Sequence, residues 1–117
     1  MDPRRSLGRA GEQLAARRYT RQGFAILDRN YRCPQGEIDI VAAREKLLVF
    51  CEVKCRHTSQ WGEPSEAVGW RKQQRLRRLA AAWLADRRPA FSELRFDVVS
   101  VVMRDGAPEV TQITDAF

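Results

Sequence analysis

The chain has only three cysteines, one histidine and no long apolar run. Cys51 and Cys55 lie four residues apart in a segment typical of a strand, which argues against a disulfide framework and favours a reducing compartment. Cys33 and His57 are the remaining soft ligands, too few for a zinc knuckle. The longest apolar stretches are far too short for a bilayer, and no signal-peptide pattern follows Met1. We therefore expect a cytoplasmic protein without membrane contact.

The composition indicates one globular domain with a basic surface. The 117 residues, 44% hydrophobic and 31% charged, suit a single domain over 1–117, in which we expect 1–6 to be disordered. The net charge of +6 and the pI near 9.9 come chiefly from arginine, which binds phosphate in a bidentate manner. A polyanionic partner such as nucleic acid explains this charge; a solvated surface from an arginine-rich proteome explains it as well.

Apolar periodicity and turn residues predict the order α-β-β-β-α-β. Helices are expected over 7–22 and from Ser65 to about Asp86, and strands over 24–30, 37–43, 47–56 and 94–103. The first three strands should form an antiparallel meander. The fourth follows a helix and can pair parallel with the third, which gives an α/β fold with a mixed sheet covered by helices.

Polar residues interrupt two strands that are otherwise apolar. Strand alternation places Glu37 and Asp39 on the face opposite Ile38, Ile40 and Ala42, and it places Glu52 and Lys54 opposite Cys51 and Val53. If the turn at 44–46 forms a hairpin, Asp39 and Glu52 lie on neighbouring strands with Lys54 one pleat beyond.

Two carboxylates and an ammonium in this setting need a partner, because buried charge is unfavourable unless it is paired. Oxygen ligands suit Mg²⁺ or Mn²⁺, which bind carboxylates and leave positions for water and substrate phosphate. Lys54 would orient the attacking water or stabilise the charge that develops on the phosphate. The alternative is structural, a salt bridge between Lys54 and Asp39 or Glu52.

Several motifs in one order resemble the YraN family over about residues 7–102. They are Gly11-Glu12, Gly36-Glu37-Ile38-Asp39, Leu48 to Arg56, Lys72 to Leu76 and Arg95 to Val99. This bacterial family is similar in fold to archaeal Holliday-junction resolvases and to the restriction-endonuclease-like, PD-(D/E)xK, nuclease superfamily. The resemblance therefore implies a restriction-endonuclease-like fold.

The resemblance also implies roles for individual residues. Asp39 and Glu52 would be metal-binding acids, Lys54 the catalytic lysine, and Glu12 the helix residue that completes the metal site. Ile38 stands where the superfamily's name-giving proline is found. Glu37 is interpreted either as an outer partner of the metal site or as a solvated neighbour.

Other basic and aromatic residues fit either a binding surface or ordinary packing. Arg56, Arg71, Arg75 and Arg78 are candidate nucleic-acid contacts, although the last three also form the wet face of an amphipathic helix. Trp61 would stack on an unpaired base or pack on the sheet rim. Trp70 and Trp83 fall at helical spacing, which favours core or subunit contact. His57 is interpreted either as a phosphate contact or as a polar loop residue. Asp97 is expected to bond to the turn or to an arginine and is assigned no chemistry.

The favoured hypothesis is a Mg²⁺-dependent or Mn²⁺-dependent endonuclease that hydrolyses DNA phosphodiesters, with branched or junction DNA inferred from the resemblance alone. Two alternatives belong to other classes: a nucleic-acid-binding module without cleavage, and a partner-binding scaffold in DNA processing. Junction resolvases act as dimers because they cut two strands symmetrically, so a homodimer is considered, although no residue pattern indicates the oligomeric state.

Overall fold

Two helices and one five-stranded sheet make up the fold. The structure, a computed structural model, describes residues 3–57 and 69–117, with side chains from residue 8 onward. In chain order the elements are α1 (Pro3–Arg21), β1 (Ala25–Cys33), β2 (Gly36–Arg44), β3 (Leu47–Arg56), α2 (Trp70–Arg87), β4 (Glu93–Arg104) and β5 (Ala107–Ile113). The strands lie in sequence order across the sheet. β1, β2 and β3 pair antiparallel, and β4 pairs parallel with β3, which confirms the predicted mixed α/β arrangement.

The element boundaries differ from the prediction at both helices. α1 begins at Pro3, so residues 3–6 form its first turn; proline is tolerated there because the first helical N–H needs no acceptor. α2 begins at Trp70 after Gly69, whereas Ser65, the expected start, lies outside the described residues. No helix in the described part of the chain is long and apolar enough to cross a membrane.

The fifth strand was missed by the sequence analysis. β5 pairs antiparallel with β4 and lies at the edge of the sheet, where its side chains are mostly exposed. Pro108 near its start weakens the strand pattern, since proline removes a ladder donor and is tolerated at edges. The preceding Asp105 and Gly106 both have positive φ, at 50° and 79°, as expected of an Asp-Gly hairpin turn. This dipeptide was the signal that could have revealed the strand.

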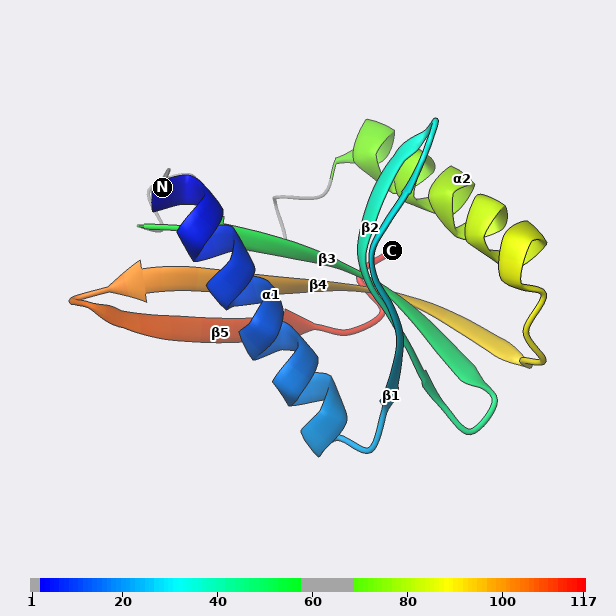
Figure 1. The fold of residues 1–117 in the computed structure, drawn as a ribbon, viewed down its shortest axis with the longest axis horizontal. Helices are drawn as coiled ribbons and strands as arrows, with labels where there is room; N and C mark the ends of the chain where they lie inside the picture. Colours follow the sequence, from blue (N-terminus) through cyan, green and yellow to red (C-terminus); the bar gives the residue numbers. More distant parts are fainter. Residues whose placement is uncertain (1–2, 58–68) are drawn as a thin grey trace.

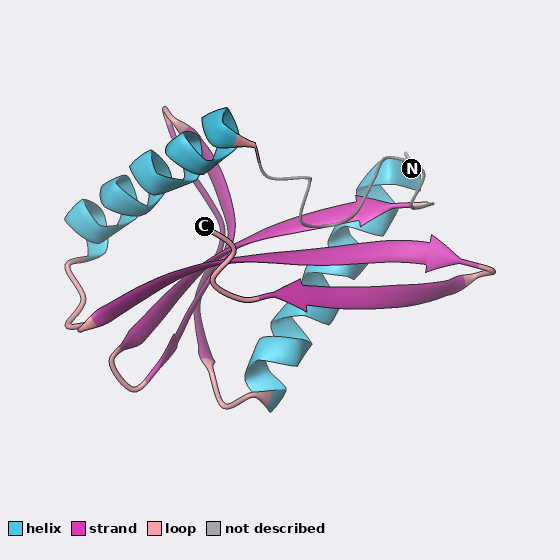
Figure 2. Ribbon diagram, turned by 180° about the vertical axis from the view of Figure 1, so that it is seen from behind, coloured by secondary structure: helices cyan, strands magenta, loops and turns pink. Residues whose placement is uncertain are grey.

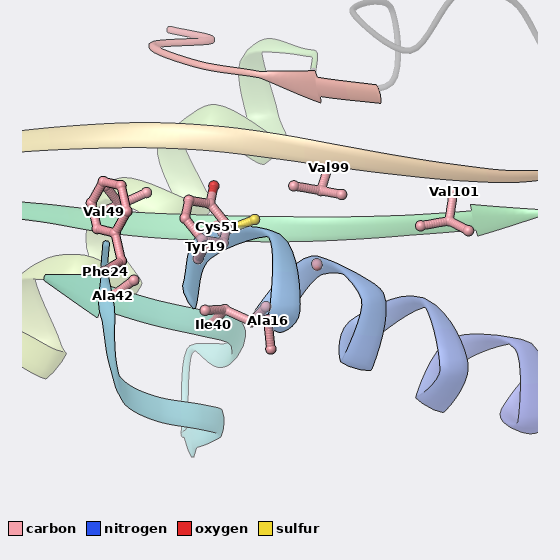
Figure 3. Close-up of a cluster of buried hydrophobic side chains, with 10 residues drawn as sticks. Ala16, Tyr19, Phe24, Ile40, Ala42, Val49, Cys51, Val99 and Val101 are labelled. Atoms are coloured by element: carbon pink, nitrogen blue, oxygen red, sulfur yellow. The ribbon is translucent and has the colours of Figure 1, made fainter. Parts of the chain in front are cut away.

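The sheet carries a helix on each face (Figures 1 and 2). The α1 face is closed by Tyr19, Phe24, Ile40, Val49, Cys51 and Val99, several of which are seen together in Figure 3. The α2 face is closed by Ile38, Phe50, Leu76, Leu79, Trp83 and Phe96. β3 contributes to both clusters through alternate residues and therefore forms the centre of the core.

A buried carboxylate, Asp97 of β4, joins α1 to the sheet. Tyr19 donates its hydroxyl to Asp97 Oδ2 at 2.6 Å, and Arg95 donates to both carboxylate oxygens at 2.9 Å. The backbone N–H of Asp115 donates to Oδ1 at 3.0 Å. Asp97 is fully buried, and these donors supply what a buried carboxylate requires. Its place in the molecule is structural.

The sheet opens between β2 and β3, and this opening creates the site described below. The described ladder between the two strands ends at the pair Ile40 and Cys51. Beyond that pair, the β1–β2 hairpin turns away from β3 toward α2 (Figure 1), where a Cβ added at Gly36 would touch Leu79.

The rotation of the β1–β2 hairpin away from β3 contradicts one expectation from strand alternation. Ile40 and Ala42 pack with α1, as predicted to share a face, but Ile38 packs with α2. Two-stranded ribbons twist more strongly than wide sheets, so the hairpin rotates once it leaves β3.

Candidate active site

Asp39 lies at the point where β2 parts from β3. Its Oδ2 atom accepts the backbone N–H of Val53 at 2.7 Å, so the side chain replaces a ladder carbonyl at the opening. Burial raises the pKa of Asp39 to about 7; the Val53 hydrogen bond opposes this, and the charges of Glu52, Glu12 and Glu37 add to it. The carboxylate is thus held in place by the backbone while its charge is poorly compensated.

Two further carboxylates approach Asp39 from other elements. Glu12 of α1, Glu37 of β2 and Asp39 present oxygens that all lie within 4.8 Å of one another, and all three residues are partly buried. Glu37 also accepts the Arg32 guanidinium at 3.1 Å. Glu37, whose role was left open by the sequence, therefore belongs to the acidic group.

Gly11 allows Glu12 to reach this group. A Cβ at position 11 would lie 2.1 Å from Cys55 Sγ, so only glycine lets α1 approach β3 this closely without a shift. The Gly11-Glu12 pair thus combines a close helix contact with an acidic side chain at the edge of the buried stripe.

Glu52 is held by two lysines on the α2 side of the sheet opening. Lys72 Nζ lies 2.6 Å from Glu52 Oε1, and Lys54 Nζ lies 3.6 Å from the same oxygen. The side chains of Glu52 and Lys72 are only 13% and 16% exposed. Burial lowers the pKa of Lys72 and nearby Lys54 lowers it further, whereas Glu52 opposes the shift. The chain has three lysines in total, and two of them meet at this carboxylate.

Lys72 was not assigned a role from the sequence alone. It lies four residues before Leu76 and seven before Leu79, which places it on the buried stripe of α2 rather than on the wet face. A charged residue on an apolar stripe is the signal that could have identified it. The three predicted metal ligands and the predicted catalytic lysine, by contrast, all lie around the sheet opening; they are Glu12, Asp39, Glu52 and Lys54.

The carboxylates offer oxygen ligands only, which fits a hard divalent cation better than zinc. Glu12, Glu37 and Asp39 are close enough to share one ion, and the repulsion that contributes to the raised pKa of Asp39 is what a cation neutralises. Glu52 lies outside this group of three but close enough to affect Asp39. The predicted ligand set of Glu12, Asp39 and Glu52 thus spans the opening, with Glu37 as an additional donor.

A basic pocket adjoins the Glu52 side of the site. It has a volume of about 630 Å³ and is lined by Gln35, Arg71, Lys72, Arg75 and Arg78, between the β1–β2 turn and α2. Within the described residues, Arg71, Arg75 and Arg78 form no ion pair. Arg56, the fourth predicted contact, ends β3 and is partly buried, and His57 beside it is exposed.

The tryptophans differ in where they lie in the structure. Trp83 is buried and donates to Asp28 at 3.1 Å, which confirms its core assignment. Trp70 is 72% exposed at the start of α2, so it does not pack in the core, and its contact with another subunit stays a prediction. Helical spacing alone did not show that it lies opposite the buried stripe. Trp61 falls outside the described residues.

Fold and site together define a small α/β protein with an acidic centre at a sheet opening and a basic pocket beside it. The chain belongs to the uncharacterised protein family UPF0102, whose model matches residues 11–101. It is 46% identical over 113 residues to a UPF0102 protein of Rhodococcus jostii, covering 96% of both chains. It is 48% identical over 114 residues to a UPF0102 protein of Syntrophotalea carbinolica, covering 97% of this chain and 93% of the relative. The family match is consistent with the YraN resemblance.

Proposed function

We propose that this protein is a Mg²⁺-dependent or Mn²⁺-dependent endonuclease that hydrolyses phosphodiester bonds in DNA, within the restriction-endonuclease-like superfamily. One observation carries the proposal: the carboxylates of Glu12, Asp39 and Glu52 come from three elements and gather at the opening of the sheet, beside Lys54. A fold without metal chemistry gains no stability from this gathering of acids.

The residues divide the work of the reaction. Glu12, Glu37 and Asp39 would hold the cation, with Glu52 on the opposite side of the opening. A bound divalent cation supplies a Lewis acid that lowers the pKa of water and neutralises phosphate charge. Lys54 orients the attacking water or stabilises charge on the phosphate. The backbone of Val53 fixes Asp39 in position, so this ligand is ordered before the substrate arrives.

The arginines of the basic pocket supply the attraction for the substrate. Arg71, Arg75 and Arg78 line the pocket next to Glu52 and can bind backbone phosphates on the strand that enters the site. Branched or junction DNA is proposed as the substrate form from the family resemblance, with a cytoplasmic location and a homodimer to cut two strands.

The test is cleavage of labelled four-way junction, flap, duplex and single-stranded DNA with Mg²⁺, Mn²⁺ or EDTA. We expect metal-dependent cutting that falls at least about 100-fold in Glu52→Gln, since removal of one charged group at a phosphoryl-transfer centre has effects of this order. Glu93→Gln, which changes an exposed glutamate on β4, is the matched control and should cut normally. Circular dichroism of each variant verifies folding.

A second function is favoured by one observation. The Glu52–Lys72 ion pair neutralises a predicted metal ligand within the chain itself, as a nucleic-acid-binding module without cleavage would do. Salt-dependent DNA binding that is indifferent to EDTA, with no product from any substrate, would support this module and refute the nuclease. Absence of DNA binding altogether would support a partner-binding scaffold instead.

A further inference from the structure

Lys72 lies where two sites meet. Its ammonium bonds Glu52 Oε1 at 2.6 Å, and the same side chain lines the basic pocket with Arg71, Arg75 and Arg78. Among the described residues, no other residue of that pocket forms an ion pair with Glu52 or with the three carboxylates of the acidic group. Lys72 therefore connects the basic pocket with Glu52.

In the structure Glu52 is engaged by positive charge on one oxygen. Lys72 holds Oε1 with a short charge-assisted hydrogen bond, and Lys54 lies 3.6 Å from the same atom. A divalent cation that approaches Glu52 is repelled by both ammonium groups. It can bind the carboxylate only if these groups give up their contacts with Oε1. The ion pair lowers the affinity of this carboxylate for metal.

The pocket offers Lys72 an alternative partner. Its three arginines have no carboxylate of their own within the described residues, so the pocket attracts anions. A phosphate held there would present a second acceptor to an ammonium on a flexible four-carbon stem. Lys72 can then exchange the carboxylate for the phosphate without movement of the α2 backbone.

We propose that Lys72 couples the two sites: a backbone phosphate in the basic pocket draws its ammonium from Glu52 and so releases this carboxylate to the metal. The inference rests on the proposed function for the identity of the cation. Coupling of this kind is reciprocal, so metal at Glu52 also strengthens phosphate binding in the pocket. The metal centre is then completed chiefly when nucleic acid is present.

The test measures Mn²⁺ binding to the full chain by electron paramagnetic resonance, without nucleic acid. Inorganic sulfate is the probe for the pocket, at ionic strength held constant with chloride. We expect sulfate to tighten Mn²⁺ binding to the unaltered protein on the order of tenfold, within the usual range of coupling between sites. Lys72→Met should bind Mn²⁺ tightly without sulfate and should not respond to it.

Two variants serve as controls. Lys46→Met removes the same charge from an exposed turn and should keep the full sulfate response. Arg75→Met should weaken the sulfate response, since Arg75 lines the pocket. The comparison of the unaltered protein with and without sulfate needs no variant and therefore does not depend on whether Lys72→Met folds.

The outcomes separate this inference from the proposed function. Mn²⁺ affinity indifferent to sulfate in the unaltered protein, or a sulfate response that persists in Lys72→Met, overturns the coupling even if DNA is cut. Absence of Mn²⁺ binding in both the unaltered protein and Lys72→Met overturns the metal centre and the coupling together. A sulfate response lost only in Lys72→Met and weakened in Arg75→Met supports the coupling even where no DNA substrate is cleaved.

Discussion

Replacement of Asp39 by asparagine should stabilise the metal-free protein at alkaline pH. Burial raises the pKa of Asp39 from 3.8 to about 7, so the folded chain binds this proton more tightly than the unfolded chain does. The stability linked to Asp39 is therefore fully present below the unfolded pKa and is lost as the pH rises from 3.8 towards 7. Asparagine keeps an oxygen for the Val53 N–H and carries no charge, so it avoids this loss.

The size of the effect follows from the two pKa values. A difference of roughly three pH units, at about 1.36 kcal/mol for each, gives an upper limit of about 4 kcal/mol above the folded pKa. Near the unfolded pKa of 3.8 the aspartate is protonated in the folded state and about half protonated in the unfolded state, so the two proteins should differ little there. The gap between them should open as the pH increases.

Urea unfolding in EDTA from about pH 4.5 to about pH 8.5, followed by circular dichroism, measures the difference directly. Other ionisable groups are common to both proteins and largely cancel. Asp105→Asn is the matched control, because Asp105 is exposed in a turn whose positive φ asparagine also tolerates. A difference between Asp39→Asn and the unaltered protein that does not change with pH would refute the account of Asp39 as a buried, poorly compensated charge.

Two other contacts give predictions of their own. Gly11→Ala should destabilise the fold by about 1–3 kcal/mol through its clash with Cys55 Sγ, whereas the same change in a Cys55→Ala background, or Gly8→Ala where the helix is open, should be neutral or stabilising. Thermal unfolding of the four proteins in the Gly11 and Cys55 double-mutant cycle measures this difference, and equal effects of Gly11→Ala in both backgrounds would contradict the predicted clash. Removing Arg71 and Arg75 together should reduce the slope of log affinity for DNA against log salt by about two, measured by fluorescence anisotropy, and an unchanged slope would exclude them as phosphate contacts.

Most of the fold could be predicted because its patterns are local. The helical stripe of α2, the apolar run of β3 and the short turns between the first strands each depend on neighbouring residues. The parallel pairing of β3 with β4 followed from the helix between them. β5 was not predicted because Pro108 and the exposed side chains of this strand weaken the strand signal. The first turn of α1 was not predicted because apolar periodicity begins only at Leu7.

The residues of the candidate site could be predicted to lie near one another, but their geometry could not. Strand alternation brought Asp39 and Glu52 to neighbouring strands, as the structure has them, but it gave no sign that the sheet opens between them. The opening brings Glu37 into the acidic group and lets Ile38 change face. Lys72 reaches Glu52 from an element twenty residues away in sequence, a contact that depends on how α2 lies over the sheet.

Two aspartates in the same sheet, Asp97 fully buried and Asp39 partly buried, differ in how their charge is compensated. Asp97 receives two bonds from Arg95, the Tyr19 hydroxyl and a backbone N–H, so its charge is compensated inside the fold. Asp39 accepts one backbone N–H among the described residues, and the charged groups that shift its pKa are carboxylates. Folding alone gives no reason to keep such a residue, because asparagine would accept the same hydrogen bond without repulsion. The contrast supports the proposal that Asp39 is compensated by a cation from outside the chain.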